Sequence, residues 1–263
     1  MRDFLGFKFY NNFVKSRGFL QVLRYPLVED HLYRYLWVKD KLKGSCLDIA
    51  CGSGWGTLQV SKNSNVSFVQ GYDINPLAYK KAKSYDNNKV RFSRVNLLNN
   101  VPKKKFDNII AFEIIEHFNK KDVLTLLENI KKFANKNTII YISTPNKDAF
   151  SPLGYKWLPY HPIEYNINTL TEILKENGYK VNKIYFQRVL FKLPHKIISY
   201  IILFPVFFFK DKTRNNKFIR LLYGILSRVE LFIGKNYYSG IHTEKSALFY
   251  PKYYILELEV SKV

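Results

Sequence analysis

The stretch LDIACGSGWG, residues 47–56, ends a short apolar run and opens a loop that contains three glycines. A glycine loop after a strand is typical of sites that bind nucleotides or nucleosides. The spacing of Gly52, Gly54 and Gly56 departs from the GxGxxG pattern of dinucleotide-binding folds, and the loop lacks the lysine of a P-loop. The loop therefore disfavours both an NAD(P)-dependent oxidoreductase and a nucleoside triphosphatase.

Two carboxylates frame this loop in the sequence. Asp48 lies inside the predicted strand, four positions before Gly52, and Asp73 ends the next predicted strand. A carboxylate beneath the loop would repel a diphosphate but suits a ligand with an ammonium or sulfonium group. An acid at the end of the second strand can accept both ribose hydroxyls. The pattern indicates a nucleoside with a positively charged end, and the alternative is a structural Asp48 beside an ordinary turn.

Strands and helices alternate between residues 45 and 178, which indicates a parallel, doubly wound α/β sheet. The hydrophobic pattern predicts strands at 45–50, 66–75, 89–98, 105–115, 137–146, 180–190 and 252–260. Helices are expected to begin near residue 57, to cover 76–84 and 120–134, and to run from 168 until Gly178 stops the last of them.

Taken together, these segments resemble the class I S-adenosylmethionine-dependent methyltransferases. LDIACGSG looks like the first motif of that family, GYDIN like its ribose-binding acid, FDNIIAFEIIEHF like its fourth strand and ISTPN like the end of its fifth. The resemblance implies a Rossmann-like, seven-stranded sheet of order 3-2-1-4-5-7-6 whose last strand is antiparallel. S-adenosyl-L-methionine and the acceptor would lie at the carboxyl ends of the strands.

The resemblance also assigns residues to the cofactor. Asn96 and Leu97 would border the adenine, although the family more often has Asp at the position of Asn96. The full set of expected cofactor-binding residues is Asp48, Ala50, Gly52, Gly54, Asp73, Ile74, Asn96, Leu97 and Phe112.

Methyl transfer to a hydroxyl needs an aligned nucleophile and a group that removes its proton. His117 and His161 are the expected acid/base residues, and Glu113 is expected to border the same site. If a helix begins at Glu113, then Glu113 and His117 lie on one face of it. Glu164 follows His161 by three positions.

Two arrangements of these residues stay open, and we expect the first. In the first, no metal is involved, as in the O-methyltransferases of quinone and glycan pathways. In the second, the chain is similar to the small-RNA 2′-O-methyltransferases, and a divalent cation such as Mg²⁺ or Mn²⁺ is held by Glu113, Glu116, His117 and His161. A third alternative is a non-catalytic nucleoside-binding protein.

The chain divides into four expected parts: an N-terminal helical cap (1–43), a methyltransferase core (44–190), an apolar and basic helical insertion (191–245) and the last core strand (246–263). The insertion, with IISYIILFPVFFF at 197–209 and a basic loop after it, has three interpretations. It caps the sheet or forms a dimer contact, it is a lid over an apolar acceptor, or residues 197–233 touch a membrane surface.

The formal net charge of +21 favours polyanionic partners such as nucleic acid, acidic lipid headgroups or phosphorylated substrates. Because the basic residues are spread along the chain and no RNA-binding module is visible, we expect a hydrophobic, lipid-linked or glycan-linked small molecule rather than nucleic acid. Cys46 and Cys51 suit reduced thiols in the cytoplasm. No apolar stretch is long enough to span a bilayer. We therefore expect a cytoplasmic protein, whereas peripheral contact at the inner membrane surface and the oligomeric state stay open.

Overall fold

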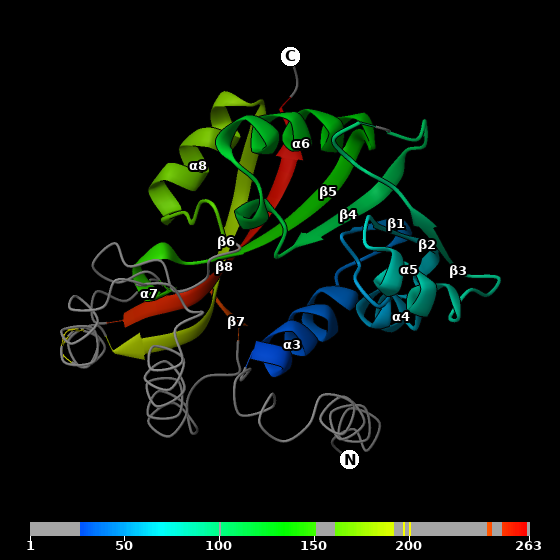
Figure 1. Ribbon diagram of the computed structural model, residues 1–263, viewed down its shortest axis with the longest axis horizontal. Helices are drawn as coiled ribbons and strands as arrows, with labels where there is room; N and C mark the ends of the chain where they lie inside the picture. Colours follow the sequence, from blue (N-terminus) through cyan, green and yellow to red (C-terminus); the bar gives the residue numbers. More distant parts are fainter. Residues whose placement is uncertain are drawn as a thin grey trace.

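A computed structural model describes residues 27–99, 101–150, 161–191, 241–243 and 249–261, together with the single residues 197 and 200 (Figure 1). Its centre is an eight-stranded sheet of order β3-β2-β1-β4-β5-β8-β6-β7. The strands are β1 (Gly44–Ile49), β2 (Val66–Asp73), β3 (Val90–Arg94), β4 (Phe106–Phe112), β5 (Ala134–Pro145), β6 (Tyr179–Phe191), β7 (Ile241–His242) and β8 (Phe249–Val260).

The expected strand order is confirmed, with one addition. Strands β1 to β5 are parallel, and the late strand β8 lies between β5 and β6, antiparallel to both (Figure 1). The addition is β7, which pairs with Phe186 and Gln187 of β6 and makes the sheet eight-stranded. A strand of two residues carries no periodicity, so its sequence does not predict it.

Helices cover both faces of this sheet. They are α3 (Leu27–Lys39), α4 (Trp55–Ser61), α5 (Pro76–Lys83), α6 (Lys120–Lys132), α7 (Lys147–Phe150) and α8 (Ile167–Glu176). One apolar cluster joins Ile109 of β4 to α6 and α8, and a second joins Ile110 to α3 and α4. Neighbouring strand residues point to opposite faces, so β4 contributes to both clusters and is buried on each side.

The expected domain limits stay predictions. Residues 27–39 of the N-terminal part are helical, whereas the insertion expected at 191–245 falls almost entirely outside the described residues. Within the part of the chain that the structure describes, no helix combines the length and the hydrophobicity needed to cross a membrane. Cys46 and Cys51 are both buried and free.

Candidate functional site

The loop between β1 and α4 contains three residues with left-handed backbone conformations. Ala50, Gly52 and Gly54 have φ values of 55°, 57° and 79°. A Cβ on Gly54 would lie 2.7 Å from the ring of Phe92, so packing as well as conformation requires glycine there. A Cβ on Gly52 would have no atom within 4 Å, so this glycine faces open space beside the loop.

Asp73 joins this loop to the end of β2. Its Oδ2 accepts a hydrogen bond from the Gly52 N–H at 2.8 Å, and its Oδ1 accepts one from the Asn75 N–H at 2.8 Å. Asn75 in turn caps α5, because its side-chain oxygen accepts from the N–H groups of Leu77 and Ala78. The acid expected to bind the ribose therefore lies beside the glycine loop, and the neighbouring Ile74 is exposed.

Asp48 lies fully buried beneath the loop. Its oxygens accept hydrogen bonds from Thr57 Oγ1 of α4 at 2.6 Å and from the Tyr35 hydroxyl of α3 at 3.0 Å. Burial raises the pKa of Asp48 to about 7, and these two hydrogen bonds oppose the shift. Asp48 thus links β1 to two helices, which is a structural role of the kind that the alternative interpretation gave it.

The other expected cofactor residues lie on the neighbouring strand ends. Asn96 follows β3, where its Oδ1 accepts from the Leu98 N–H at 3.0 Å, and Leu97 is buried beside it. Phe112 ends β4 and packs edge-to-face on Tyr35, with ring centroids 5.3 Å apart. The expected set therefore follows the carboxyl ends of β3, β2, β1 and β4, and its contact with the cofactor stays a prediction.

Glu113 does not share a helix face with His117, so that expectation is wrong. Its φ of 52° places it in the left-handed region just after β4, and only a single 3-10 turn, η1 (Ile115–His117), follows. The Oε1 of Glu113 accepts hydrogen bonds from Arg34 Nη1 at 2.7 Å and Ser143 Oγ at 2.9 Å. Burial raises the pKa of Glu113, and the positive charge of Arg34 opposes the shift.

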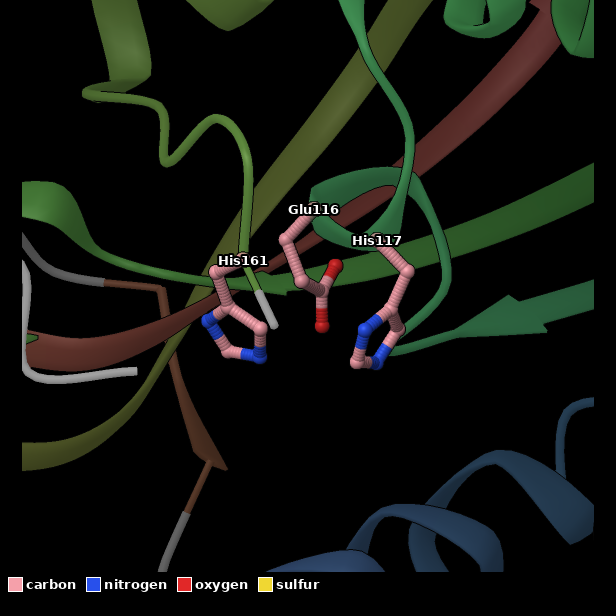
Figure 2. Close-up of side chains that lie close together, drawn as sticks. All are labelled: Glu116, His117 and His161. Carbon is pink, nitrogen blue, oxygen red and sulfur yellow. The ribbon is translucent and has the colours of Figure 1, made fainter. Parts of the chain in front are cut away.

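Glu116, His117 and His161 come together at the carboxyl ends of β4 and β5 (Figure 2). One potential ligand atom of each residue lies within 4.8 Å of the other two, and the Glu116 carboxylate lies between the two imidazoles. Glu116 is buried, and its Oε2 accepts from Thr144 Oγ1 at 3.0 Å. Its Oε1 has no hydrogen-bond partner among the described residues.

The orientation of His161 depends on the segment that follows it. The Nδ1 of His161 lies 3.1 Å from Glu164 Oε1, and both side chains are 6% exposed. This segment is attached to the end of β5, because Asn146 forms a parallel bridge with Tyr165. A carboxylate at Nδ1 favours the tautomer that carries its proton there, which leaves Nε2 as an acceptor.

The structure thus separates the four residues of the alternative metal set. Three form the cluster, and Glu113 belongs to the ion pair with Arg34. Sequence analysis missed Arg34, whose buried guanidinium lies 4.4 Å over the ring of Tyr253. The signal was present in α3, where Asp30 and Arg34 are four positions apart and so share a face that includes buried apolar residues.

Comparison with known families agrees with this geometry. A family model described as “Methyltransferase domain” matches residues 23–184. The chain belongs to this methyltransferase family. The glycine loop, Asp48 and Asp73 indicate the same enzyme class, a methyltransferase, and the same cofactor, S-adenosylmethionine.

Two curated relatives match parts of this methyltransferase. One, from Mycolicibacterium smegmatis, is named “Probable S-adenosylmethionine-dependent methyltransferase”; it is 27% identical over 136 residues, which cover 51% of each chain. The other is the ubiquinone biosynthesis O-methyltransferase of Pelagibacter ubique, 35% identical over 94 residues, with 31% of this chain and 38% of that protein covered. The methyltransferase therefore spans about half or less of the length of these relatives.

Solved structures confirm the fold. An S-adenosylmethionine-dependent methyltransferase from Archaeoglobus fulgidus is 21% identical, covers 95% of this chain and 98% of its own, and has a TM-score of 0.55. The [4+2]-cyclase SpnF is 16% identical, covers 88% and 81%, and has a TM-score of 0.53. Since a cyclase shares the architecture, the fold alone does not define the reaction, and the acceptor has to be argued from the site.

Proposed function

We propose that this methyltransferase transfers the methyl group of S-adenosylmethionine to a hydroxyl of a hydrophobic small molecule that is linked to a lipid or a glycan. The observation that carries the proposal is the cluster of two imidazoles and one carboxylate next to the strand ends that bear the expected cofactor residues. A hydroxyl must lose its proton as it is methylated, and an imidazole can accept one near neutral pH.

In this reaction the hydroxyl oxygen forms a bond to the methyl carbon while the carbon–sulfur bond breaks. The electron pair of that bond stays on sulfur, so the sulfonium becomes the neutral thioether of S-adenosylhomocysteine. The hydroxyl proton passes to an imidazole. His161 suits this role, because Glu164 at Nδ1 leaves Nε2 as the acceptor, and the exposed His117 can pass the proton on to water.

Two features support a hydrophobic acceptor. The relative from Pelagibacter ubique is named for the biosynthesis of ubiquinone, which carries a long apolar tail. Residues 197–209 of this chain are almost wholly apolar, and the basic residues Lys210, Lys212, Arg214 and Lys217 follow them. We extend the proposal to a peripheral contact of residues 197–233 with an anionic membrane surface, where such an acceptor would be presented.

Incubation with methyl-labelled S-adenosylmethionine and three acceptors tests the proposal: a polyprenylated catechol, a lipid-linked sugar and a short RNA with a free 3′ end. We expect label in the first or second acceptor, and none in matched acceptors whose hydroxyls are already methylated. His161→Asn should lower kcat by about 10²- to 10⁴-fold without changing the affinity for S-adenosylhomocysteine.

The other outcomes contradict the proposal in distinct ways. Label in RNA alone would favour an RNA 2′-O-methyltransferase. Binding of S-adenosylhomocysteine without turnover on any acceptor would favour a non-catalytic nucleoside-binding protein.

A further inference from the structure

We propose that the guanidinium of Arg34 binds an oxyanion of the acceptor, a carboxylate or a phosphate, through its Nε and Nη2 atoms. Arg34 lies on α3 and is fully buried, and its Nη1 donates to the Glu113 carboxylate at 2.7 Å. The inference rests on the proposed function, because it names a second chemical group on the acceptor whose hydroxyl is methylated. Arg34 is then a residue that determines which acceptors the enzyme uses.

Two of the three nitrogens of the Arg34 guanidinium have no use in the fold. Nε and Nη2 are buried without a hydrogen-bond partner among the described residues. These two atoms lie on the same side of the planar guanidinium and direct two N–H groups in parallel, which matches two oxygens of one carboxylate or phosphate. A buried donor without a partner is costly, and a bound oxyanion removes that cost. The pair of unused donors therefore indicates both a ligand and its chemistry.

Contacts on its other sides hold the guanidinium in place. Glu113, which accepts from Nη1, also accepts from Ser143 Oγ of β5 at 2.9 Å. The guanidinium carbon of Arg34 lies over the ring of Tyr253, 4.4 Å from its centroid. A donor pair that is fixed in this way loses little side-chain freedom when it binds an oxyanion.

The charges around Arg34 also favour an anion. Burial raises the pKa of Asp30, and the positive charges of Arg188, Lys252 and Arg34 oppose the shift, so three cations act on one carboxyl group. The ion pair with Arg188 is short, since Nε of Arg188 lies 2.9 Å from Asp30 Oδ1. Lys252, on β8, is buried as well.

The glutamates after β4 do not offset this positive charge. Burial raises the pKa of Glu113 and raises the pKa of Glu116 well above its usual range, and the charge of Glu113 adds to the rise at Glu116. A proton on either carboxyl group increases the positive excess near Arg34. An excess of buried charge is costly, and an anionic acceptor supplies the missing counter-charge.

The place of these cations in the sheet favours the acceptor over the cofactor as the source of the oxyanion. Arg34 pairs with Glu113, three positions before Glu116 of the histidine cluster. Arg188 and Lys252 belong to β6 and β8, which lie beyond β5 in the sheet order. The glycine loop follows β1, on the other side of β4. The positive charge is therefore gathered on the half of the site where the acceptor is expected.

Matched pairs of probes test the inference by calorimetry on protein saturated with S-adenosylhomocysteine. One pair is a catechol that carries a carboxylate and the corresponding amide; the other is farnesyl phosphate and farnesol. We expect the anionic member of one pair to bind about 10- to 100-fold more tightly than its uncharged partner, and that pair identifies the oxyanion.

Variants assign this preference to the Nε and Nη2 donors. Arg34→Lys keeps a positive charge beside Glu113 but loses the paired donors, so it should abolish the preference while the uncharged probes bind as before. Arg91→Lys, the same change at an exposed arginine of β3, is the matched control and should retain the preference. Circular dichroism identifies a variant that fails to fold, and the preference of the wild-type protein tests the inference without any variant.

Three results would overturn the proposal. One is a wild-type protein that binds neither anionic probe more tightly than its uncharged partner. Another is a preference that survives in Arg34→Lys. The third is a loss of S-adenosylhomocysteine affinity in Arg34→Lys as large as the loss for the anionic probe, which would assign the donors to the carboxylate of the cofactor. Methyl transfer to the uncharged catechol amide would uphold the proposed function in each case. An Arg34-dependent preference without methyl transfer to any hydroxyl would contradict the proposed function alone.

Discussion

The two ends of the site differ in how their carboxylates are satisfied. At the glycine loop, each oxygen of Asp73 accepts a hydrogen bond from a backbone N–H, and each oxygen of Asp48 accepts one from a side-chain hydroxyl. At the ends of β4 and β5, Glu113 pairs with the arginine of a distant helix, and one buried oxygen of Glu116 has no hydrogen-bond partner in the described part of the chain. The loop end is held by partners close in the sequence or on adjacent elements. The other end holds carboxyl groups whose pKa is raised by burial, and one of them, Glu113, pairs with a residue far away in the sequence.

Removing Arg34, the long-range partner of Glu113, should have the largest effect on the free energy of unfolding. Arg34→Met leaves the carboxylate of Glu113 without its cation in a mostly buried site, and we expect a loss of about 3–5 kcal/mol in the free energy of unfolding. Urea denaturation measures this loss. The double variant Arg34→Met/Glu113→Gln removes the stranded charge and should recover part of the stability. If the double variant is as unstable as the single one, the ion pair between Arg34 and Glu113 does not stabilise the site at the ends of β4 and β5.

At the loop end, two glycines should respond unequally to the same substitution. Gly54→Ala adds left-handed strain and a collision with Phe92, for an expected loss of about 2–5 kcal/mol. Gly52→Ala adds strain alone, about 1–2 kcal/mol, because its Cβ meets nothing. Thermal and urea unfolding of both variants measure the difference, and equal losses would contradict the packing role of Gly54.

The buried Asp48 predicts a pH dependence that is confined to the loop end. Its pKa is raised to about 7, so the carboxyl is mostly neutral at pH 6 and mostly ionised at pH 8. A positively charged cofactor favours the ionised form, and we expect its affinity to rise about tenfold over this range. Calorimetry with S-adenosylmethionine measures it, and Asp48→Asn should remove the dependence. A flat wild-type profile would show that Asp48 does not sense the charge of the cofactor.

The smallest effects on stability should come from two helix N-caps, one at each end of the site, and these effects should be equal. Asn75 caps α5 beside the loop, and Asn119 caps α6 beyond the cluster, each through its side-chain oxygen. Asn75→Ala and Asn119→Ala should each cost about 1 kcal/mol of unfolding free energy, as N-cap losses usually do. Chemical denaturation of both variants is the measurement. A clearly larger loss at one of them would show that local capping also differs between the two ends.

The parts of the molecule that could be predicted from the sequence are those with local signals. The alternation of strands and helices, the glycine loop and the position of Asp73 all follow from residues close together in the chain. The pairing of Glu113 with Arg34 joins residues 79 positions apart and has no such signal. The helix on which Glu113 and His117 would have shared a face does not begin at Glu113, because the backbone there is left-handed at a residue that is not glycine. In this conformation the Glu113 N–H donates to the Ser143 carbonyl of β5, and the Glu113 side chain accepts from Arg34 of α3.

The place of β8 bears on how the chain acquires this structure during synthesis. Strand β8 holds residues 249–260, yet it lies inside the sheet, between β5 and β6 (Figure 1). When only the first 240 residues have left the ribosome, β8 does not yet exist. The edges of β5 and β6 that pair with β8 in the finished sheet are then unpaired. Exposed edges of this kind recruit other strands. We therefore expect a chain that stops near residue 248 to aggregate rather than to form a smaller enzyme.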